Sequence, residues 1–263
     1  MRFTTHSATF EYDDVGNGTP LLLVHGFPLD RALWRTQIEG LHSVARLIAP
    51  DLRGFGQSSD APDTMTMNDY AADLKALLHA LNIERAVVCG LSMGGYIALA
   101  FLAKYPEAVK GLILANTRAG ADSEQAREGR YANARKAFEE GVPSIANAML
   151  PKMLTDATRE HRSSLAEFVG SMMARQRPGG VAAALKGMAA RPDHTPMLAS
   201  INVPTLIITG RADTLIPPSK SEAMARAIPG SRLVVVPDAA HLSNVENPEA
   251  FNAAVKEFIE RLK

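Results

Sequence analysis

The segment Gly90-Leu91-Ser92-Met93-Gly94 has the residue types of an activated serine nucleophile. It fits the pattern G-x-S-x-G and lies between an apolar run, Ala86–Cys89, and a helical pattern that begins near Gly94. A strand-to-helix turn of this kind points the serine Oγ away from the backbone, and the flanking glycines leave room for it. The five-residue pattern alone also fits a Gly-rich turn with an incidental serine. Its position between strand and helix favours Ser92 as a nucleophile.

A serine hydroxyl is a weak nucleophile until a base accepts its proton. In architectures that place the serine on such a turn, the chain order is serine, acid, histidine. We predict His241 as the base because it follows the strand pattern Leu233–Val236 in a short loop. The other histidines after Ser92 are His161 and His194. Both lie in a region of helical pattern, where we expect them to be solvated.

Asp213 is the predicted acid because it directly follows the strand pattern Thr205–Thr209 and precedes His241. A carboxylate at that position can accept a hydrogen bond from the imidazole Nδ1, which fixes the tautomer and stabilises the imidazolium. Asp238 is the alternative acid. It lies only three residues before His241 in the same loop, which favours a role in shaping that loop.

The tetrahedral oxyanion of acyl transfer needs two backbone donors. One is predicted to be the N–H of Met93, the residue after the nucleophile. The other is predicted to be the N–H of Phe27, in the loop that follows an early strand pattern. His25 precedes the serine in the chain, so we expect it to form hydrogen bonds within this loop and hold the donors in place.

Short apolar strand patterns alternate with helical patterns along most of the chain. This alternation predicts an α/β fold with a mostly parallel sheet and helices on both faces. The first two strand patterns, Thr9–Val15 and Leu21–Val24, are joined through Asn17-Gly18, a pair suited to the positive-φ turns of hairpins. The later strand patterns are Leu47–Ala49, Ala86–Cys89, Leu112–Ala115, Thr205–Thr209 and Leu233–Val236. Thr66 and Asp69 form a predicted capping box before a helix.

The stretch 117–200 differs from the rest because it shows helical patterns and no convincing strand. We predict that it is a helical cap inserted over one edge of the sheet, with residues 1–116 and 201–263 forming the α/β core. Six of the eleven methionines lie in it, at positions 149, 153, 172, 173, 188 and 197. Their thioethers could line an adaptable acyl pocket, but helix packing is the commoner role and the one we favour.

The composition predicts a folded chain with no net charge. Of 263 residues, 46% are apolar and 21% are charged, close to globular averages. The 28 basic residues balance 28 acidic ones, which argues against nucleic-acid binding and against an electrostatic membrane anchor. Cys89 is the only cysteine and the N-terminus has no signal-peptide pattern, so we predict a cytoplasmic protein without disulfides.

Three further features have ordinary interpretations. The uncharged stretch Ala86–Ala103 reaches the minimum length of a membrane span, but the glycines and serine in its middle favour strand, turn and helix. Trp34, the only tryptophan, is expected in the core. No residue cluster has metal-ligand spacing and no Gly-rich loop resembles a phosphate cradle, so we expect no cofactor and no metal.

Taken together, the motifs resemble the α/β-hydrolase superfamily over nearly the full chain. The matching segments are His25-Gly26-Phe27, Asp51-Leu52-Arg53-Gly54-Phe55-Gly56-Gln57-Ser58, Gly90-Leu91-Ser92-Met93-Gly94-Gly95, Gly210-Arg211-Ala212-Asp213 and His241. The resemblance implies an eight-stranded sheet, a helical cap, and Ser92, Asp213 and His241 as the catalytic triad. It assigns the Asp51–Ser58 loop a supporting role beside the site. The serine at position 92 excludes haloalkane dehalogenases and epoxide hydrolases, which carry Asp there.

Within the superfamily, the chain is similar to small carboxylesterases, 3-oxoadipate enol-lactonases and cofactor-free perhydrolases. We expect a serine hydrolase that cleaves small carboxylic esters through an acyl-enzyme. An enol-lactonase acting on a small dicarboxylate lactone is the first alternative, and it would need cap arginines facing the site. The candidates are Arg118, Arg127, Arg130, Arg135, Arg175 and Arg177. The second alternative is a triad-bearing ligand receptor with slow turnover.

Overall fold

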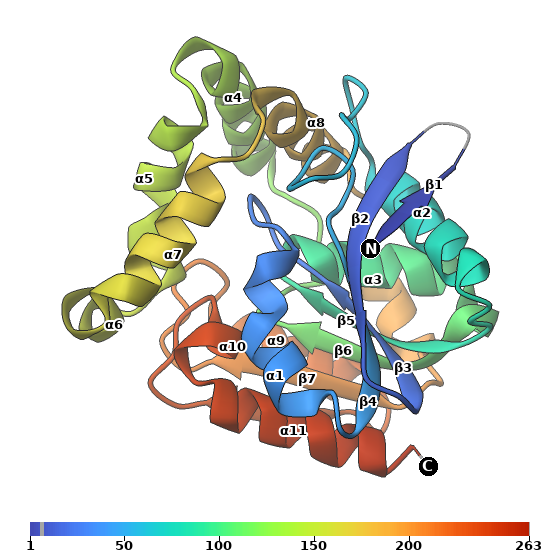
Figure 1. Cartoon of the computed structure of the whole chain (residues 1–263). Coiled ribbons are helices and arrows are strands. Elements are labelled where there is room, and N and C mark those ends of the chain that lie inside the picture. Colours follow the sequence, from blue (N-terminus) through green and yellow to red (C-terminus); the bar gives the residue numbers. More distant parts are fainter. Residues whose placement is uncertain (6–7, 263) are drawn as a thin grey trace.

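The structure is a computed structural model that describes residues 1–5 and 8–262. Its sheet has the strand order β1-β2-β4-β3-β5-β6-β7-β8 (Figure 1). The two edge pairs β1–β2 and β2–β4 are antiparallel, and the remaining pairs are parallel. The strands are β1 (Arg2–Thr4), β2 (Thr9–Val15), β3 (Thr19–Val24), β4 (Ala45–Pro50), β5 (Ala86–Leu91), β6 (Val109–Ala115), β7 (Thr205–Gly210) and β8 (Arg232–Val236). The predicted α/β fold with a mostly parallel sheet is confirmed.

Helices cover both faces of the sheet. On one face lie α2 (Met67–Ala80), α3 (Met93–Lys104) and α9 (Pro218–Ala227), and on the other α1 (Arg35–Leu41) and α11 (Pro248–Glu260) (Figure 1). Successive strand residues point to opposite faces. Leu22 therefore packs in the apolar core on the side of α2, α3 and α9, and Leu21 packs in the core on the side of α1 and α11. This burial on both sides explains why the central strands are largely apolar, as in β5, where every residue is buried. Three short helices complete the core, η1 (Arg31–Trp34), η2 (Pro106–Ala108) and α10 (Ser243–Glu246), and η3 (Thr195–Ser200) lies near the end of the connection from β6 to β7.

The start of α2 shows the predicted capping box. The amide of Asp69 donates to Thr66 Oγ1 at 3.1 Å, and the amide of Thr66 donates to Asp69 Oδ2 at 2.9 Å. Trp34 also lies where it was predicted, with no exposed surface and its ring centroid 6.3 Å from that of Phe251. Local signals therefore located these elements correctly.

The strands predicted on either side of Asn17-Gly18 are present, but they are not neighbours in the sheet. Strands β2 and β3 are not partners, because β4 lies between them and bonds to both. The positive φ angles fall at Gly16 (88°) and Gly18 (96°). A Cβ on Gly16 would lie 2.3 Å from the carbonyl oxygen of Ala45, so close backbone packing against the start of β4 requires a glycine there.

The connection from β6 to β7 contains no strand in the described chain. It holds α4 (Glu124–Glu139), α5 (Val142–Met153), α6 (Asp156–His161), α7 (Ser163–Ala174) and α8 (Pro178–Ala189), which gather at one side of the molecule (Figure 1). These helices lie within residues 117–200, and we call that segment the cap. Its methionines Met153, Met172, Met173 and Met188 are at most 2% exposed and belong to the apolar cores. No helix among the described residues is long and apolar enough to cross a membrane.

Three arginines converge on one buried carboxylate, that of Asp122, where the chain enters the cap. Arg118 and Arg130 bond to it, and Arg191 bonds to it at 2.8 Å. The Arg191 guanidinium also lies 4.0 Å from the ring centroid of Tyr96 in α3, which links the two ends of the cap to the core. Burial acts to raise the pKa of Asp122, but hydrogen bonds from Arg191 and Arg130 outweigh it and lower that pKa to about 2.

Replacing Asp122 by Asn is expected to lower the free energy of unfolding at pH 7 by about 2 kcal/mol. A carboxyl pKa lowered from 3.8 to about 2 stabilises the folded state above pH 3.8, and this stabilisation is lost as pH falls towards 2. Urea denaturation of wild type and Asp122→Asn at several pH values measures the effect. The difference between the two should shrink below pH 4. A difference that stays constant from pH 7 to pH 2.5 would contradict this account.

Candidate active site

Ser92 lies on the tight turn between β5 and α3, as its motif predicts. Its backbone has φ 56° and ψ −114°, a conformation that non-glycine residues seldom adopt. Three hydrogen bonds hold it there. Its amide donates to Ala115 O at 2.9 Å, and its carbonyl accepts from Gly95 N at 2.9 Å and Thr117 Oγ1 at 2.8 Å. The side chain stands at the end of a buried strand and is itself partly exposed.

The glycines of the motif allow the turn to pack tightly. A Cβ on Gly90 would lie 2.1 Å from Gly94 O, and one on Gly94 would lie 2.1 Å from Val24 O. A larger residue at Gly90 would therefore push β5 and the start of α3 apart, and one at Gly94 would push the turn away from the end of β3. The same argument applies at Gly26, where a Cβ would lie 3.2 Å from Ser92 Cβ. The loop after β3 is thus in direct contact with the serine.

Asp213 and His241 are brought together by the loops after β7 and β8. His241 Nδ1 lies 2.9 Å from Asp213 Oδ2, and neither side chain has exposed surface. A Cβ on Gly210 would lie 2.0 Å from Ala240 O, so a glycine is needed where the two loops meet. Within the described residues, His241 Nε2 is buried and has no protein hydrogen-bond partner. That nitrogen remains available to accept a proton.

The Asp213 carboxylate is held by groups on all sides. Its Oδ1 accepts from the amides of Leu215 at 3.0 Å and Ile216 at 2.9 Å. Its Oδ2 accepts from Asn116 Nδ2 at 2.9 Å in addition to His241. These donors fix the plane of the carboxylate that faces the imidazole.

The alternative acid and the other histidines lie apart from this arrangement. Asp238 is exposed with φ 53°, consistent with the loop-shaping role predicted for it. His161 is exposed, as expected. His194 is half-buried, so the prediction that it is solvated is only partly right. Burial lowers the pKa of His194, against the opposing charge of Asp193.

Asn116 is a site residue that the sequence analysis missed. It follows β6, is fully buried, and has φ 45°. Its Nδ2 bonds to Asp213 Oδ2 and, at 3.1 Å, to Ala240 O, while its Oδ1 accepts from Ser243 Oγ at 2.6 Å. Asn116 thereby ties the acid to the loop that carries His241. Its position directly after a strand, at the same sheet edge as Ser92, was the signal available in the sequence.

Replacing Asn116 by Gly is expected to lower kcat about tenfold, because it removes one charge-assisted hydrogen bond to the acid. Glycine accepts the positive φ, so backbone strain does not confound the comparison. Asn82, another asparagine with positive φ (54°), provides the control Asn82→Gly far from the site. Steady-state ester hydrolysis measures both variants. Equal kcat values for the two would show that Asn116 does not support the acid.

The loop after β3 orients the amide of Phe27. Gly26 O accepts from His25 Nδ1 at 2.9 Å and from Leu29 N at 3.0 Å, and His25 Nε2 accepts from Leu52 N at 3.0 Å. Burial lowers the pKa of His25, which keeps the ring neutral with its proton on Nδ1. Because the peptide unit is planar, fixing the Gly26 carbonyl also fixes the Phe27 N–H on its opposite side. The prediction that His25 bonds within this loop is confirmed.

The amides of Phe27 and Met93 are free to act as a donor pair. Among the described residues, neither N–H donates to another protein group. Met93 is the first residue of α3, where amides have no intrahelical acceptor and the helix dipole favours negative charge. Both amides flank Ser92, one along the chain and one through the contact at Gly26.

The loop Asp51–Ser58 supports the loop after β3. The buried Asp51 carboxylate accepts from the amides of Arg31 and Gln57, each at 2.8 Å. Burial raises the pKa of Asp51 despite these donors. Gly56 has φ 52°, and a Cβ there would lie 2.2 Å from Asp51 Oδ2. These contacts match the structural role that the resemblance implies.

The six cap arginines proposed for substrate binding fall into two groups. Arg127 and Arg135 are exposed. The other four face acidic partners: Arg118 and Arg130 with Asp122, Arg175 with Asp30, and Arg177 with Asp60. Cys89 is fully buried, which raises the pKa of its thiol and makes it unreactive. The described residues contain no group of three or more His, Cys, Asp or Glu side chains that could hold a metal ion.

Comparison with known proteins agrees with this geometry. The family model of the alpha/beta hydrolase fold matches residues 19–248. The chain therefore belongs to the α/β-hydrolase fold family. It is 32% identical to 3-oxoadipate enol-lactonase 1 of Acinetobacter baylyi, over 94% of this chain and 91% of that protein.

Two solved structures extend the similarity. A thermophilic esterase from Thermogutta terrifontis, with malate bound, superposes with a TM-score of 0.97 at 43% identity, covering 100% of this chain and 98% of that one. The enol-lactonase from Burkholderia xenovorans LB400 superposes with a TM-score of 0.92 at 29% identity, covering 99% and 100%. Both matches include the cap as well as the sheet.

Proposed function

We propose that this protein is a carboxylic-ester hydrolase that uses Ser92, His241 and Asp213 as a catalytic triad and acts on small esters or lactones. The observation that carries the proposal is the buried 2.9 Å contact between His241 and Asp213, in loops beside the strained turn of Ser92. The esterase and enol-lactonase similarities support the same chemistry. The substrate is a small molecule, and the reaction as written uses neither metal nor organic cofactor.

In the acylation half-reaction, Ser92 Oγ attacks the ester carbonyl carbon while His241 Nε2 accepts the hydroxyl proton. The carbonyl oxygen becomes an oxyanion, which the amides of Phe27 and Met93 stabilise. The tetrahedral intermediate then collapses, and His241 returns the proton to the departing alkoxide. In the second half-reaction, water attacks the carbonyl carbon of the acyl-enzyme while His241 Nε2 accepts its proton. The bond to Ser92 Oγ then breaks, the carboxylic acid is released, and His241 returns the proton to Ser92.

Hydrolysis of p-nitrophenyl esters from acetate to laurate tests the proposal. We expect fast turnover of the short esters and a decline with increasing chain length, because the proposed substrates are small esters. An organophosphonate probe added to the same enzyme should react once and abolish turnover. Absence of turnover of every ester and lactone, together with no labelling by the probe, would overturn the proposal.

A lactone with an anionic group is the second candidate substrate. The observation in its favour is the cluster at Asp122, where three guanidiniums share one carboxylate and leave a positive excess in the cap. The assay therefore includes a neutral lactone and a carboxylate-bearing lactone. A preference for the anionic one that disappears in Arg118→Met would assign enol-lactonase-type specificity. A ligand receptor with slow turnover has no separate support, and the cytoplasmic location stays a prediction.

A further inference from the structure

One segment of the cap bonds directly to the loop that carries the Phe27 amide. Asp30 follows Leu29, whose amide bonds to Gly26 O, and Asp30 also begins η1 by accepting from Ala32 N at 3.0 Å. Only two residues, Pro28 and Leu29, therefore separate the proposed oxyanion donor Phe27 from Asp30. Asp30 is 3% exposed, so its negative charge needs partners inside the protein.

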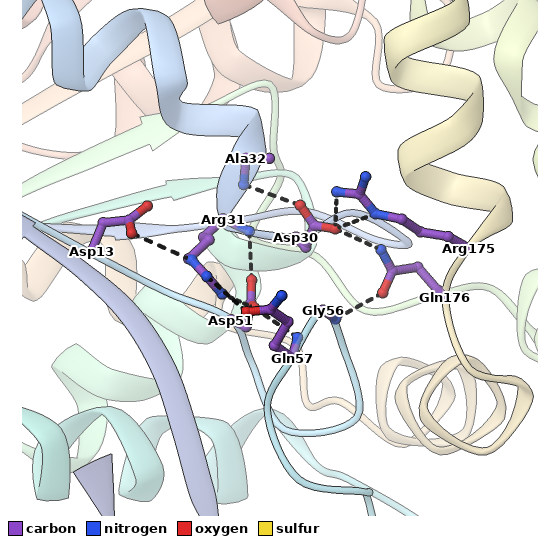
Figure 2. A pocket seen from close by; sticks show the side chains of 9 residues that line it. All are labelled: Asp13, Asp30, Arg31, Ala32, Asp51, Gly56, Gln57, Arg175 and Gln176. Carbon is purple, nitrogen blue, oxygen red and sulfur yellow. Dashed lines mark hydrogen bonds and ion pairs between the residues drawn. The ribbon is translucent and has the colours of Figure 1, made fainter. Parts of the chain in front are cut away.

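The partners of Asp30 come from the cap, just after the end of α7. Its Oδ2 accepts from Arg175 Nε at 3.1 Å, Arg175 Nη2 at 2.6 Å and Gln176 Nε2 at 3.0 Å. Figure 2 shows the Arg175 and Gln176 side chains reaching from the cap towards the Asp30 carboxylate. A guanidinium that gives two donors to one carboxylate fixes direction as well as distance.

Gln176 also connects the cap to the second supporting loop. Its Oε1 accepts from Gly56 N at 2.9 Å, and its Nε2 donates to Met172 O at 2.7 Å in addition to Asp30. The residue is 5% exposed. One buried amide thus joins three segments: the end of α7, the loop that ends at Asp30, and the loop Asp51–Ser58. The contacts with Asp30 and Gly56 depend on the cap being in place, whereas the contact with Met172 lies within the cap.

Polar contacts add to apolar packing at this junction, where Leu29 and Met172 belong to the same buried apolar cluster. A pocket of about 440 Å³ opens beside it, lined mainly by charged and polar groups (Figure 2). The Arg175 side chain is 54% exposed, so its ion pair with Asp30 can open towards solvent. If it opens, Asp30 keeps its Ala32 contact but loses the donors that neutralise it.

We propose that Arg175 and Gln176 are positioning residues. Through Asp30, they couple the position of the cap to the orientation of the Phe27 amide, the proposed oxyanion donor. The inference rests on the proposed function. With the cap in place, the chain from Gly26 to Asp30 is held at both ends, by His25 at one and by the cap at the other. Without the cap contact, Asp30 relaxes towards solvent and the Phe27 peptide loses its fixed orientation. The cap then controls transition-state stabilisation as well as substrate access.

This coupling predicts a loss in kcat with little change in KM, because oxyanion contacts strengthen in the transition state. Arg175→Met keeps the aliphatic stem of the side chain and removes its hydrogen-bond donors. We expect kcat to fall about tenfold, which is less than the roughly 100-fold loss that a 1 Å misplacement of catalytic groups can cause. Gln176→Leu should act in the same direction. Affinity for a boronic acid, which forms a tetrahedral serine adduct, should fall by a similar factor.

Arg177→Met is the matched control. Arg177 lies in the same cap segment but bonds to Ser58 O at 2.5 Å and to Asp60 at 3.0 Å, not to Asp30. We expect this variant to lower the unfolding temperature while kcat stays within twofold. Assays run well below the unfolding temperature of each variant separate stability from catalysis. In a double-mutant cycle, Arg175→Met added to Asp30→Asn should cause no further loss if the two act through one contact.

The outcomes separate this inference from the proposed function. Wild-type ester turnover that depends on Ser92 establishes the function first, and its absence would overturn both. With that turnover present, unchanged kcat in Arg175→Met would overturn the inference alone. So would equal losses in Arg175→Met and Arg177→Met, a change confined to KM, or additive effects in the cycle with Asp30→Asn.

Discussion

Ser92→Ala is expected to lower kcat for the best p-nitrophenyl ester by about 10⁶-fold, the size of effect seen when the nucleophile of such a triad is removed. The alanine leaves no atom that can form the acyl-enzyme, while the oxyanion donors and the binding site remain. KM should therefore change little. Discontinuous assays with long incubation at high enzyme concentration measure the residual rate of hydrolysis.

The control for this prediction is a serine that is fully buried. Ser221 in α9 has no exposed surface, and its hydroxyl has no hydrogen-bond partner in the described part of the chain. Ser221→Ala should keep wild-type kcat, and both variants should keep the wild-type unfolding temperature to within a few degrees. If Ser92→Ala retained more than a hundredth of the wild-type rate, the nucleophile would have to be assigned elsewhere.

Asp213→Asn is expected to lower kcat by about 10⁴-fold at neutral pH. The carboxylate accepts from His241 Nδ1, which leaves Nε2 free to take the proton of Ser92. An asparagine can turn its NH₂ towards Nδ1, which moves the imidazole proton to Nε2 and removes the base. The pH–rate profile and kcat of the variant measure this loss.

Asp238→Asn provides the matched comparison, because Asp238 is the other carboxylate considered for the acid. Asp238 is exposed, and the carboxylate that accepts the hydrogen bond of His241 Nδ1 is that of Asp213. We expect kcat of Asp238→Asn to stay within twofold of wild type. A larger loss in Asp238→Asn than in Asp213→Asn would reverse the assignment of the acid.

The sequence located most of the fold because its signals are local. Apolar runs such as Leu112–Ala115 and the capping box at Thr66 depend on neighbours along the chain, and both appear in the structure. Strand pairing depends on distant residues instead. The Asn17-Gly18 pair therefore suggested adjacent strands, although β4 inserts between them. Strand β1, only three residues long, had too little pattern to be recognised.

The candidate triad residues could be predicted because each follows a strand whose end meets the others at one sheet edge. The same rule applied to Asn116, but an asparagine after a strand is also common in ordinary turns. Only the structure shows its bonds to Asp213 and Ser243. The cap contacts were beyond sequence reasoning for a different reason. Arg175 meets Asp30 across 145 positions, and nothing in the local pattern of either segment indicates the other.

The arrangement divides the site between a rigid core and a polar cap junction. The proposed acid and base are buried together with Asn116 and Ser243. Within the described residues, the polar side-chain atoms of this group have protein partners, apart from His241 Nε2. The oxyanion loop, in contrast, is fixed on one side by the core residue His25 and on the other by the cap residue Arg175. Substitutions in the cap can therefore change both substrate choice and the rate of the chemical step.

The most direct test of the central claim, that Ser92 carries the acyl group, is peptide mapping after inactivation by an organophosphonate. We expect one adduct per chain, located on the peptide that contains Ser92, and a loss of hydrolytic activity in proportion to the labelling. A competing ester should slow both the labelling of Ser92 and the loss of activity. Complete inactivation with the adduct on another residue, or full activity with Ser92 modified, would contradict the account.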